Sequence, residues 1–135
     1  MQKNMELLYS VRQYTQSVMN KWLQNFPYSV SISALLVLEE LKKNGPQKQI
    51  TLTKLLKLTP GAMTNIAAKL VSEEYAERVY NVQDRRITRL KITDTGMGLL
   101  KIAYETNEEL NADLLNTLSD EEKDLFIKLL KKVSQ

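Results

Sequence analysis

The feature that most constrains the fold is residues 75–92, where apolar and polar side chains alternate as they do in β-strands. Two alternating halves flank the polar stretch NVQDRR, which is typical of a turn. We therefore predict a single hairpin. Its strands would be 75–80 and 87–92, with Val79, Leu90 and Ile92 toward the core and Arg78, Arg89 and Lys91 outward.

The rest of the chain follows the period of amphipathic helices, with apolar side chains at steps of three and four. Clear start signals precede several of these segments. They are Thr59 before Pro60, Thr93 before Asp94, and a capping box from Ser119 to Glu122. The predicted helices are 5–26, 31–44, 49–57, 60–74, 94–116 and 120–133, and the second of them is apolar on most faces and should be the most buried.

This order predicts a mainly α (α+β) fold, a winged helix-turn-helix, because two compact helices joined by a turn precede the hairpin. The long helices at both ends are additional to that module. Their apolar faces need burial, and a helical dimer interface provides it. We predict one domain, 1–135, in which 1–44 and 94–135 form the dimerisation region of a homodimer and 45–93 form the winged-helix lobe.

The sequence contains no histidine and no cysteine. Disulfides, thiol redox switches and histidine general bases are therefore excluded, and a zinc site would have to rely on carboxylates. We expect a protein that is not an enzyme and has no cofactor and no metal. With no signal peptide and no long apolar run, we also expect it to stay in the cytoplasm, away from membranes.

The net charge of +3 is unevenly spread. Residues 1–44 carry +2, residues 45–93 carry +5 and residues 94–135 carry −4. A basic middle segment favours a polyanionic partner, although chance clustering on a solvated surface explains the charge equally well.

The helix predicted at 60–74 has a front half suited to a DNA major groove. An ordinary surface helix usually carries more charge, whereas residues 60–68 carry none. Asn65 could pair with adenine through two hydrogen bonds, Thr64 could contact a phosphate or a thymine methyl, and Lys69 could reach a phosphate. The small side chains that would permit close approach are Gly61, Ala62, Thr64 and Ala68.

At the tip of the hairpin, Asp84 is followed by Arg85 and Arg86. A plain polar turn is one interpretation of this stretch. Two adjacent arginines gain nothing from a core, however, and suit phosphates or a narrow minor groove. Asp84 could hold one guanidinium in a fixed orientation through a bidentate pair, and the turn geometry decides which arginine is held.

The stretches LTPGAMTNIAAKL and ERVYNVQDRRITRLKITDTG resemble the multiple-antibiotic-resistance regulator (MarR) family. Its members typically show a leucine–serine/threonine–proline start to the recognition helix, an ER strand, a DRR wing, and a helix start with threonine, an acid and glycine. Thr93, Asp94 and Gly96 fill the last pattern. The motifs cover about residues 45–98, and the terminal helices fit the family by pattern and length.

The resemblance implies a homodimeric DNA-binding repressor on a pseudo-palindromic operator, with each wing in a minor groove and a possible small aromatic effector. It places wing residues at Asp84, Arg85 and Arg86 and base- or phosphate-facing residues at Thr64, Asn65 and Lys69. Many relatives have arginine where Asn65 stands, so base preference cannot be copied. The complete predicted DNA-binding set is Gly61, Ala62, Thr64, Asn65, Lys69, Asp84, Arg85, Arg86 and Arg89.

The sequence departs from the family pattern at Lys57 and Glu74, where glycines usually end the third and fourth helices in a left-handed cap. Either these residues adopt a costly positive φ or both helices end differently. We expect the second outcome, with a somewhat changed angle of the recognition helix.

Two further questions stay open at this point. A winged-helix module that binds protein instead of DNA would have the same fold, and the acidic C-terminal third slightly favours it. An aromatic effector pocket is possible, but core packing is the favoured role of the aromatic residues, so no ligand residues are named. These residues are Tyr9, Tyr14, Trp22, Phe26 and Tyr28.

Overall fold

The computed structural model describes residues 1–134 as six helices and one antiparallel hairpin, and the predicted type and order of these elements are confirmed. The boundaries fall within a few residues of those expected. The elements are α1 (Gln2–Asn25), α2 (Ile32–Asn44), α3 (Gln49–Leu55), α4 (Pro60–Ser72), β1 (Ala76–Tyr80), β2 (Thr88–Ile92), α5 (Asp94–Leu115) and α6 (Asp120–Val133).

The chain forms two compact units. Tyr28–Tyr104 make up the winged-helix unit, and Met1–Pro27 with the described residues from Glu105 onward make up the terminal-helix unit. The winged-helix unit is wider than the lobe predicted at 45–93, because α2 packs against α4 and β2. The helix α5 contributes its first half to one unit and its second half to the other.

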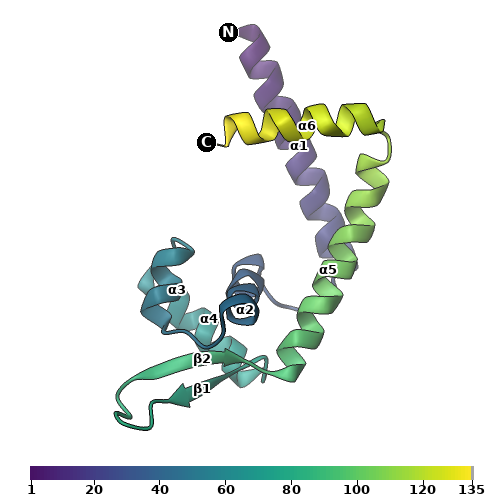
Figure 1. Cartoon of the computed structure of the whole chain (residues 1–135). Helices are drawn as coiled ribbons and strands as arrows, with labels where there is room; N and C mark the ends of the chain where they lie inside the picture. Colours follow the sequence, from purple (N-terminus) through teal and green to yellow (C-terminus); the bar gives the residue numbers. More distant parts are fainter. Residues whose placement is uncertain (135) are drawn as a thin grey trace. The chain divides into compact units, whose positions relative to one another are not determined.

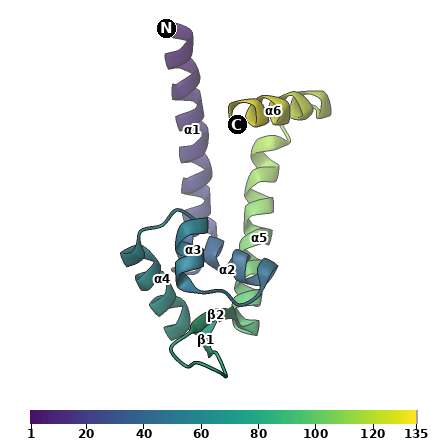
Figure 2. The same ribbon diagram turned by 60° about the vertical axis from the view of Figure 1, so that its left-hand side comes forward.

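The winged-helix unit is built around α2, which is the most buried helix, as predicted. Figure 2 shows α2, α3 and α4 grouped above the hairpin. Full burial of a large apolar side chain contributes about 1.5–3 kcal/mol, so this core fixes the position of α4. The fully buried large side chains come from every element of the unit except β1: Val37, Leu38, Leu41, Leu52, Met63, Leu70, Leu90 and Leu100.

The hairpin pairs Arg78 with Leu90 and Val79 with Arg89. Directly opposite residues lie on the same face of a sheet. Val79 therefore shares the face of Arg89 and is exposed, so the prediction that it packs with Leu90 and Ile92 is wrong. Leu90 is buried as expected, and its backbone also pairs with Gln47 through hydrogen bonds of 3.0 and 2.8 Å.

The start of α5 lies very close to the end of α4. The Thr93 hydroxyl donates to the Glu74 carbonyl at 2.6 Å and accepts from the Gly96 amide at 3.0 Å. The Thr93 amide donates to the Tyr75 carbonyl at 3.1 Å. The threonine–acid–x–glycine motif therefore joins the C-terminal end of α4 to the first turn of α5.

The expectation that Lys57 and Glu74 avoid a positive φ is wrong, because their φ angles are +54° and +64°. After α4, the Glu74 amide donates to the Val71 carbonyl and the Tyr75 amide donates to the Leu70 carbonyl. This is the Schellman pattern of hydrogen bonds. The hydrogen bonds retain the left-handed cap, so the helices end where a glycine would end them, at a steric cost of about 1–2 kcal/mol per residue.

Replacing Glu74 with glycine is therefore expected to raise the free energy of unfolding by about 0.5–1 kcal/mol. Relief of the left-handed strain would exceed the extra backbone entropy of the unfolded chain. Urea unfolding measures the change. Glu73 is the matched control, because its φ of −86° is ordinary and a glycine there should destabilise. Equal effects at both positions would contradict the strain argument.

In the terminal-helix unit, neither α1 nor α6 contains a buried residue within the part of the chain that the structure describes. Trp22 and Phe26 stack at 4.5 Å between ring centroids. Exposed large apolar side chains line both helices, among them Leu7, Leu8, Val11, Leu23, Phe126, Leu129, Leu130 and Val133. Within residues 1–134, none of the helices combines the length and hydropathy that a membrane span requires.

Candidate nucleic-acid interface

Helix α4 presents one buried face and one open face. Its N-terminus is fixed because the Thr59 hydroxyl accepts from the Ala62 amide at 3.1 Å, with Pro60 at the first helical position. Met63, Ala67 and Leu70 are buried. Gly61, Thr64, Asn65, Ala68 and Lys69 are exposed, and Ala62 is half-buried.

The open face offers few but varied polar groups. The Thr64 hydroxyl donates to the Pro60 carbonyl at 2.9 Å, so toward a ligand it keeps its methyl group and its acceptor lone pairs. Asn65 and Lys69 lie one turn apart, and both are exposed. The Asn65 amide can make two hydrogen bonds to a ligand, and Lys69 provides a positive charge beside it. An uncharged front half followed by one lysine suits close approach to base edges next to a phosphate contact.

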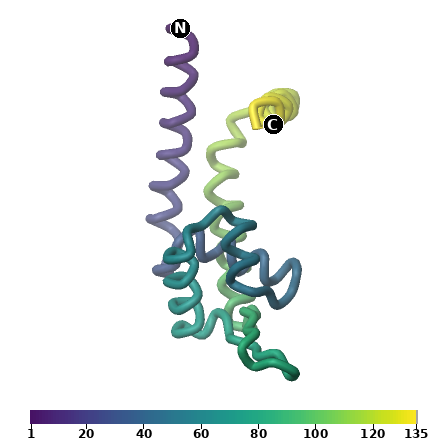
Figure 3. Tube along the Cα trace, turned by 90° about the vertical axis from the view of Figure 1, so that its left-hand side faces the viewer, coloured from purple at the N-terminus to yellow at the C-terminus, as the bar shows by residue number. Residues whose placement is uncertain are grey.

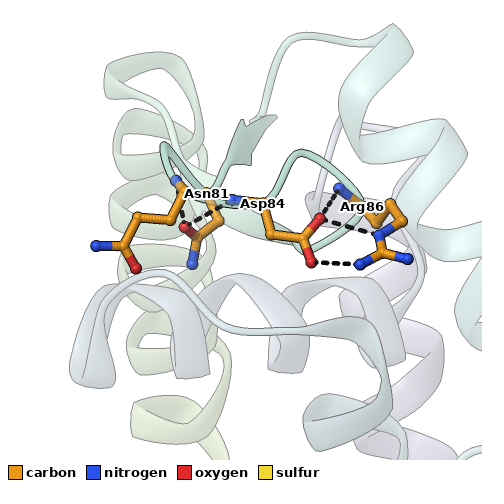
Figure 4. Close-up of polar contacts among 4 residues, drawn as sticks. Asn81, Asp84 and Arg86 are labelled. Carbon is orange, nitrogen blue, oxygen red and sulfur yellow. Dashed lines mark hydrogen bonds and ion pairs between the residues drawn. The ribbon is translucent and has the colours of Figure 1, made fainter.

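The wing loop, residues 81–87, holds the second part of the candidate interface. In Figures 1 and 3 this loop projects from the helices of the winged-helix unit. Asp84 Oδ1 accepts from Arg86 Nε at 3.1 Å and Oδ2 accepts from Arg86 Nη2 at 3.0 Å. The bidentate pair expected of Asp84 is therefore present, and Arg86 is the arginine that it holds (Figure 4).

The pair leaves much of the arginine free. The Arg86 side chain is 90% exposed, and the two contacts to Asp84 occupy two of its five N–H donors. The remaining donors can meet phosphate oxygens or the acceptors of a minor groove. Within residues 1–134, the structure gives Arg85 no hydrogen bond or ion pair, so this neighbour is exposed without a fixed orientation.

The side-chain hydrogen bonds from Arg86 to Asp84, with a smaller contribution from the Arg86 backbone amide, lower the pKa of Asp84. The same contact raises the pKa of Arg86. Because the folded-state pKa of Asp84 is depressed, the pair is fully formed above the ordinary carboxyl pKa near 3.9 and is lost as pH falls through the lowered value. The wing arginine therefore stays held throughout the neutral range.

Sequence reasoning missed two contacts at this interface. Asn81 accepts two backbone amides of the wing loop, from Gln83 at 2.8 Å and Asp84 at 3.3 Å. Arg78 Nη1 donates to Gln49 Oε1 at 2.8 Å, which ties β1 to the start of α3. Asn81 could have indicated the first contact, because asparagine side chains often bond the backbone two residues further along in a turn. Nothing in the sequence pattern indicates the second.

A shallow cavity of about 220 Å³ lies beside α4 in the winged-helix unit. Burial, followed by the charges of Glu73 and Tyr28, raises the pKa of Tyr75 at its wall. Among the described residues no group of three acidic, histidine or cysteine side chains is arranged to hold a metal ion. The cavity is lined by Val30, Ser31, Ala34, Asn65, Ile66, Lys69, Leu70, Glu73 and Tyr75.

Comparisons with known proteins agree with this geometry. The model of the MarR family matches residues 30–88. The multiple antibiotic resistance protein MarR of Salmonella typhimurium is 26% identical over 128 residues, which are 94% of this chain and 88% of that protein.

Two solved structures show the same fold. The crystal structure of YusO from Bacillus subtilis has a TM-score of 0.83 and 25% identity, and the match covers 99% of this chain and 96% of that one. PcaV from Streptomyces coelicolor, crystallised with its natural ligand, has a TM-score of 0.73 and 20% identity. The match covers 92% of this chain and 88% of that one. Similarity therefore extends over both units of the chain.

Proposed function

The chain belongs to the MarR family of winged helix-turn-helix DNA-binding transcriptional regulators, and we propose that it acts as a homodimeric repressor of a pseudo-palindromic operator. Helix α4 would lie in the major groove and the wing loop in the adjacent minor groove. Two such helices related by a twofold axis would sit about one helical turn, roughly 34–36 Å, apart.

The observation that carries this proposal is the bidentate Asp84–Arg86 pair in the wing loop. A bidentate carboxylate orients Arg86 while its side chain stays 90% exposed. Apart from its pair with Asp84, the Arg86 side chain stabilises no other part of the fold that the structure describes, and its remaining N–H donors stay free. Because less side-chain freedom is lost on binding, such a cation favours a polyanion at this loop.

Replacing Arg86 with alanine is expected to weaken binding to every DNA sequence by about tenfold. The slope of log affinity against log salt should also fall by about one, since one phosphate contact is lost. Fluorescence anisotropy at several salt concentrations measures both quantities. Lys101, an exposed cation on α5, is the matched control, and its alanine variant should change neither. Unaltered affinity and slope for the Arg86 variant would defeat the wing assignment.

Asn65 should behave differently from the wing. If its amide reads a base edge, replacing it with alanine changes preference at one base-pair position by about 1–3 kcal/mol. Selection of bound sequences from a random pool, with wild type and variant side by side, measures that preference. A uniform loss over all sequences would mean that Asn65 contacts only the DNA backbone.

The homodimer would use the terminal-helix unit. In α1 and α6 the exposed apolar side chains leave a large hydrophobic surface on a single chain. Surfaces of this kind mark interaction sites, and a twofold dimer buries the same face on both copies. A regulator that acts on bacterial DNA would accordingly work in the cytoplasm.

We also propose that a small aromatic compound acts as an effector that regulates DNA binding by this protein. PcaV was crystallised with its natural ligand, and BpsR of Bordetella bronchiseptica is described as regulated in DNA binding by 6-hydroxynicotinic acid. The cavity beside α4 is lined by Asn65 and Lys69, which also belong to the proposed DNA-facing set. An occupant of that cavity would compete with DNA for these two side chains.

A further inference from the structure

The wing loop is held by hydrogen bonds that its own atoms make. At its ends, the Asn81 amide donates to the Ile87 carbonyl at 3.0 Å, and the Ile87 amide donates to the Asp84 carbonyl at 3.1 Å. The hydrogen bonds that the structure describes for residues 81–87 all join atoms within this stretch. The conformation of the loop therefore depends on a small number of internal acceptors.

The side chains of Asn81 and Asp84 accept five of these seven hydrogen bonds, and they act in series. Asn81 Oδ1 accepts from the Gln83 amide at 2.8 Å and from the Asp84 amide at 3.3 Å. Asp84 Oδ1 then accepts from the Arg86 backbone amide at 3.0 Å, while the same carboxylate accepts two hydrogen bonds from the Arg86 guanidinium. Figure 4 shows the two turns side by side, with Asp84 between Asn81 and Arg86.

We infer that Asn81 is a positioning residue for DNA binding, which fixes the backbone of Asp84 and through it the direction of Arg86. This inference rests on the proposed function, because it assigns Asn81 a role in the same wing contact. Asn81 need not touch DNA. Its amide oxygen determines where the carboxylate of Asp84 lies, and the carboxylate determines where the guanidinium points.

The physical reason is the cost of ordering a loop. Without the Asn81 oxygen, the amides of Gln83 and Asp84 would bind water instead, and several backbone conformations would become accessible. Arg86 would then have to be ordered at the moment of binding, which reduces affinity. The core of the winged-helix unit does not include this loop, so the fold should remain intact.

The test is a double-mutant cycle of Asn81→Ala and Arg86→Ala, with affinity measured on a duplex selected by the wild type and on a random-sequence duplex. In the wild-type background, Asn81→Ala should lower affinity for both duplexes by about fivefold. In the Arg86→Ala background it should have no further effect, because the residue acts through Arg86. Circular dichroism melting verifies that each variant is folded.

Two further variants complete the experiment. Asn81→Ser keeps a neutral oxygen that can cap the same turn, so it should recover much of the affinity. Val82→Ala is the matched control, since this fully exposed side chain lies in the same loop and makes no hydrogen bond there. It should bind DNA as the wild type does.

The outcomes separate the two proposals. If Arg86→Ala lowers affinity but Asn81→Ala does not, the positioning role is wrong and the wing contact stands. An equal loss from Asn81→Ala in both backgrounds also overturns the inference, because it would mean a role independent of Arg86. If Arg86→Ala itself binds DNA like the wild type, the wing contact of the proposed function fails, and the role of Asn81 fails with it.

Discussion

Replacing Gly96 with alanine is expected to destabilise the winged-helix unit by about 3 kcal/mol or more. A methyl group built at this position would lie well inside the contact distance of the Tyr75 carbonyl oxygen, and only 2.8 Å from Ile92 Cγ1. The carbonyl belongs to the backbone and accepts the Thr93 amide at 3.1 Å, so it cannot rotate away without breaking that bond. Either α5 or the end of α4 has to move.

Thermal and urea unfolding measure this loss, and Gly98 provides the control on the same helix. Nothing lies within 4 Å of a methyl group built at Gly98. Alanine there should stabilise the protein by about 0.5–1 kcal/mol through helix propensity. If Gly96→Ala is as stable as Gly98→Ala, the close approach of α5 to Tyr75 is not the reason for glycine in the motif.

The variant also bears on DNA binding. The carbonyl of Glu74, the residue with positive φ just after α4, accepts from the Thr93 hydroxyl. The Thr93 hydroxyl also accepts from the Gly96 amide and so caps the first turn of α5. A displacement at Gly96 therefore moves the C-terminal end of α4, the helix proposed to enter the major groove. We expect the folded fraction of Gly96→Ala to bind DNA more weakly than the wild type.

Helix positions could be predicted from the sequence because each start carries a local signal. Ser31, Thr59 and Ser119 were expected at or next to helix starts, and each accepts a backbone amide there. The open face of α4 was also expected from the sequence, and Thr64, Asn65 and Lys69 lie exposed on it. Capping and periodicity are properties of short stretches, so one sequence is enough to read them.

The failures arose where a contact distant in sequence decides the outcome. Strand alternation could not place Val79, because its face depends on a register set by the partner strand. Glu74 was expected to avoid a positive φ on local sterics alone, yet it keeps the hydrogen bonds of the left-handed cap, and the Thr93 hydroxyl donates to its carbonyl from nineteen residues away. For the wing, the sequence indicated the Asp84–arginine pair but not which arginine takes part in it, and the structure shows that the Asp84 carboxylate binds both the backbone amide and the guanidinium of Arg86.

The second large effect is expected from Leu130→Glu in α6, which should convert the proposed dimer to monomer at concentrations where the wild type is expected to be dimeric. Phe126, Leu130 and Val133 recur at helical spacing along one side of α6 and are 39%, 49% and 77% exposed in the single chain. If a second copy covers this side, a buried carboxylate without a partner raises the dimer dissociation constant by about 100-fold. Sedimentation velocity over a range of concentrations measures the shift.

DNA affinity should fall along with the dimer. A monomer contacts one half-site, and it loses the effective concentration that brings the second winged-helix unit to the other half, a loss of about 10²–10⁴-fold. Lys128→Gln is the matched control, because it changes the net charge by the same amount on the opposite, polar side of α6. Binding to an isolated half-site should be equal in all three proteins, since α4 and the wing loop are unaltered. A Leu130→Glu protein that remains dimeric and binds the full site normally would place the dimer interface elsewhere than on this face of α6.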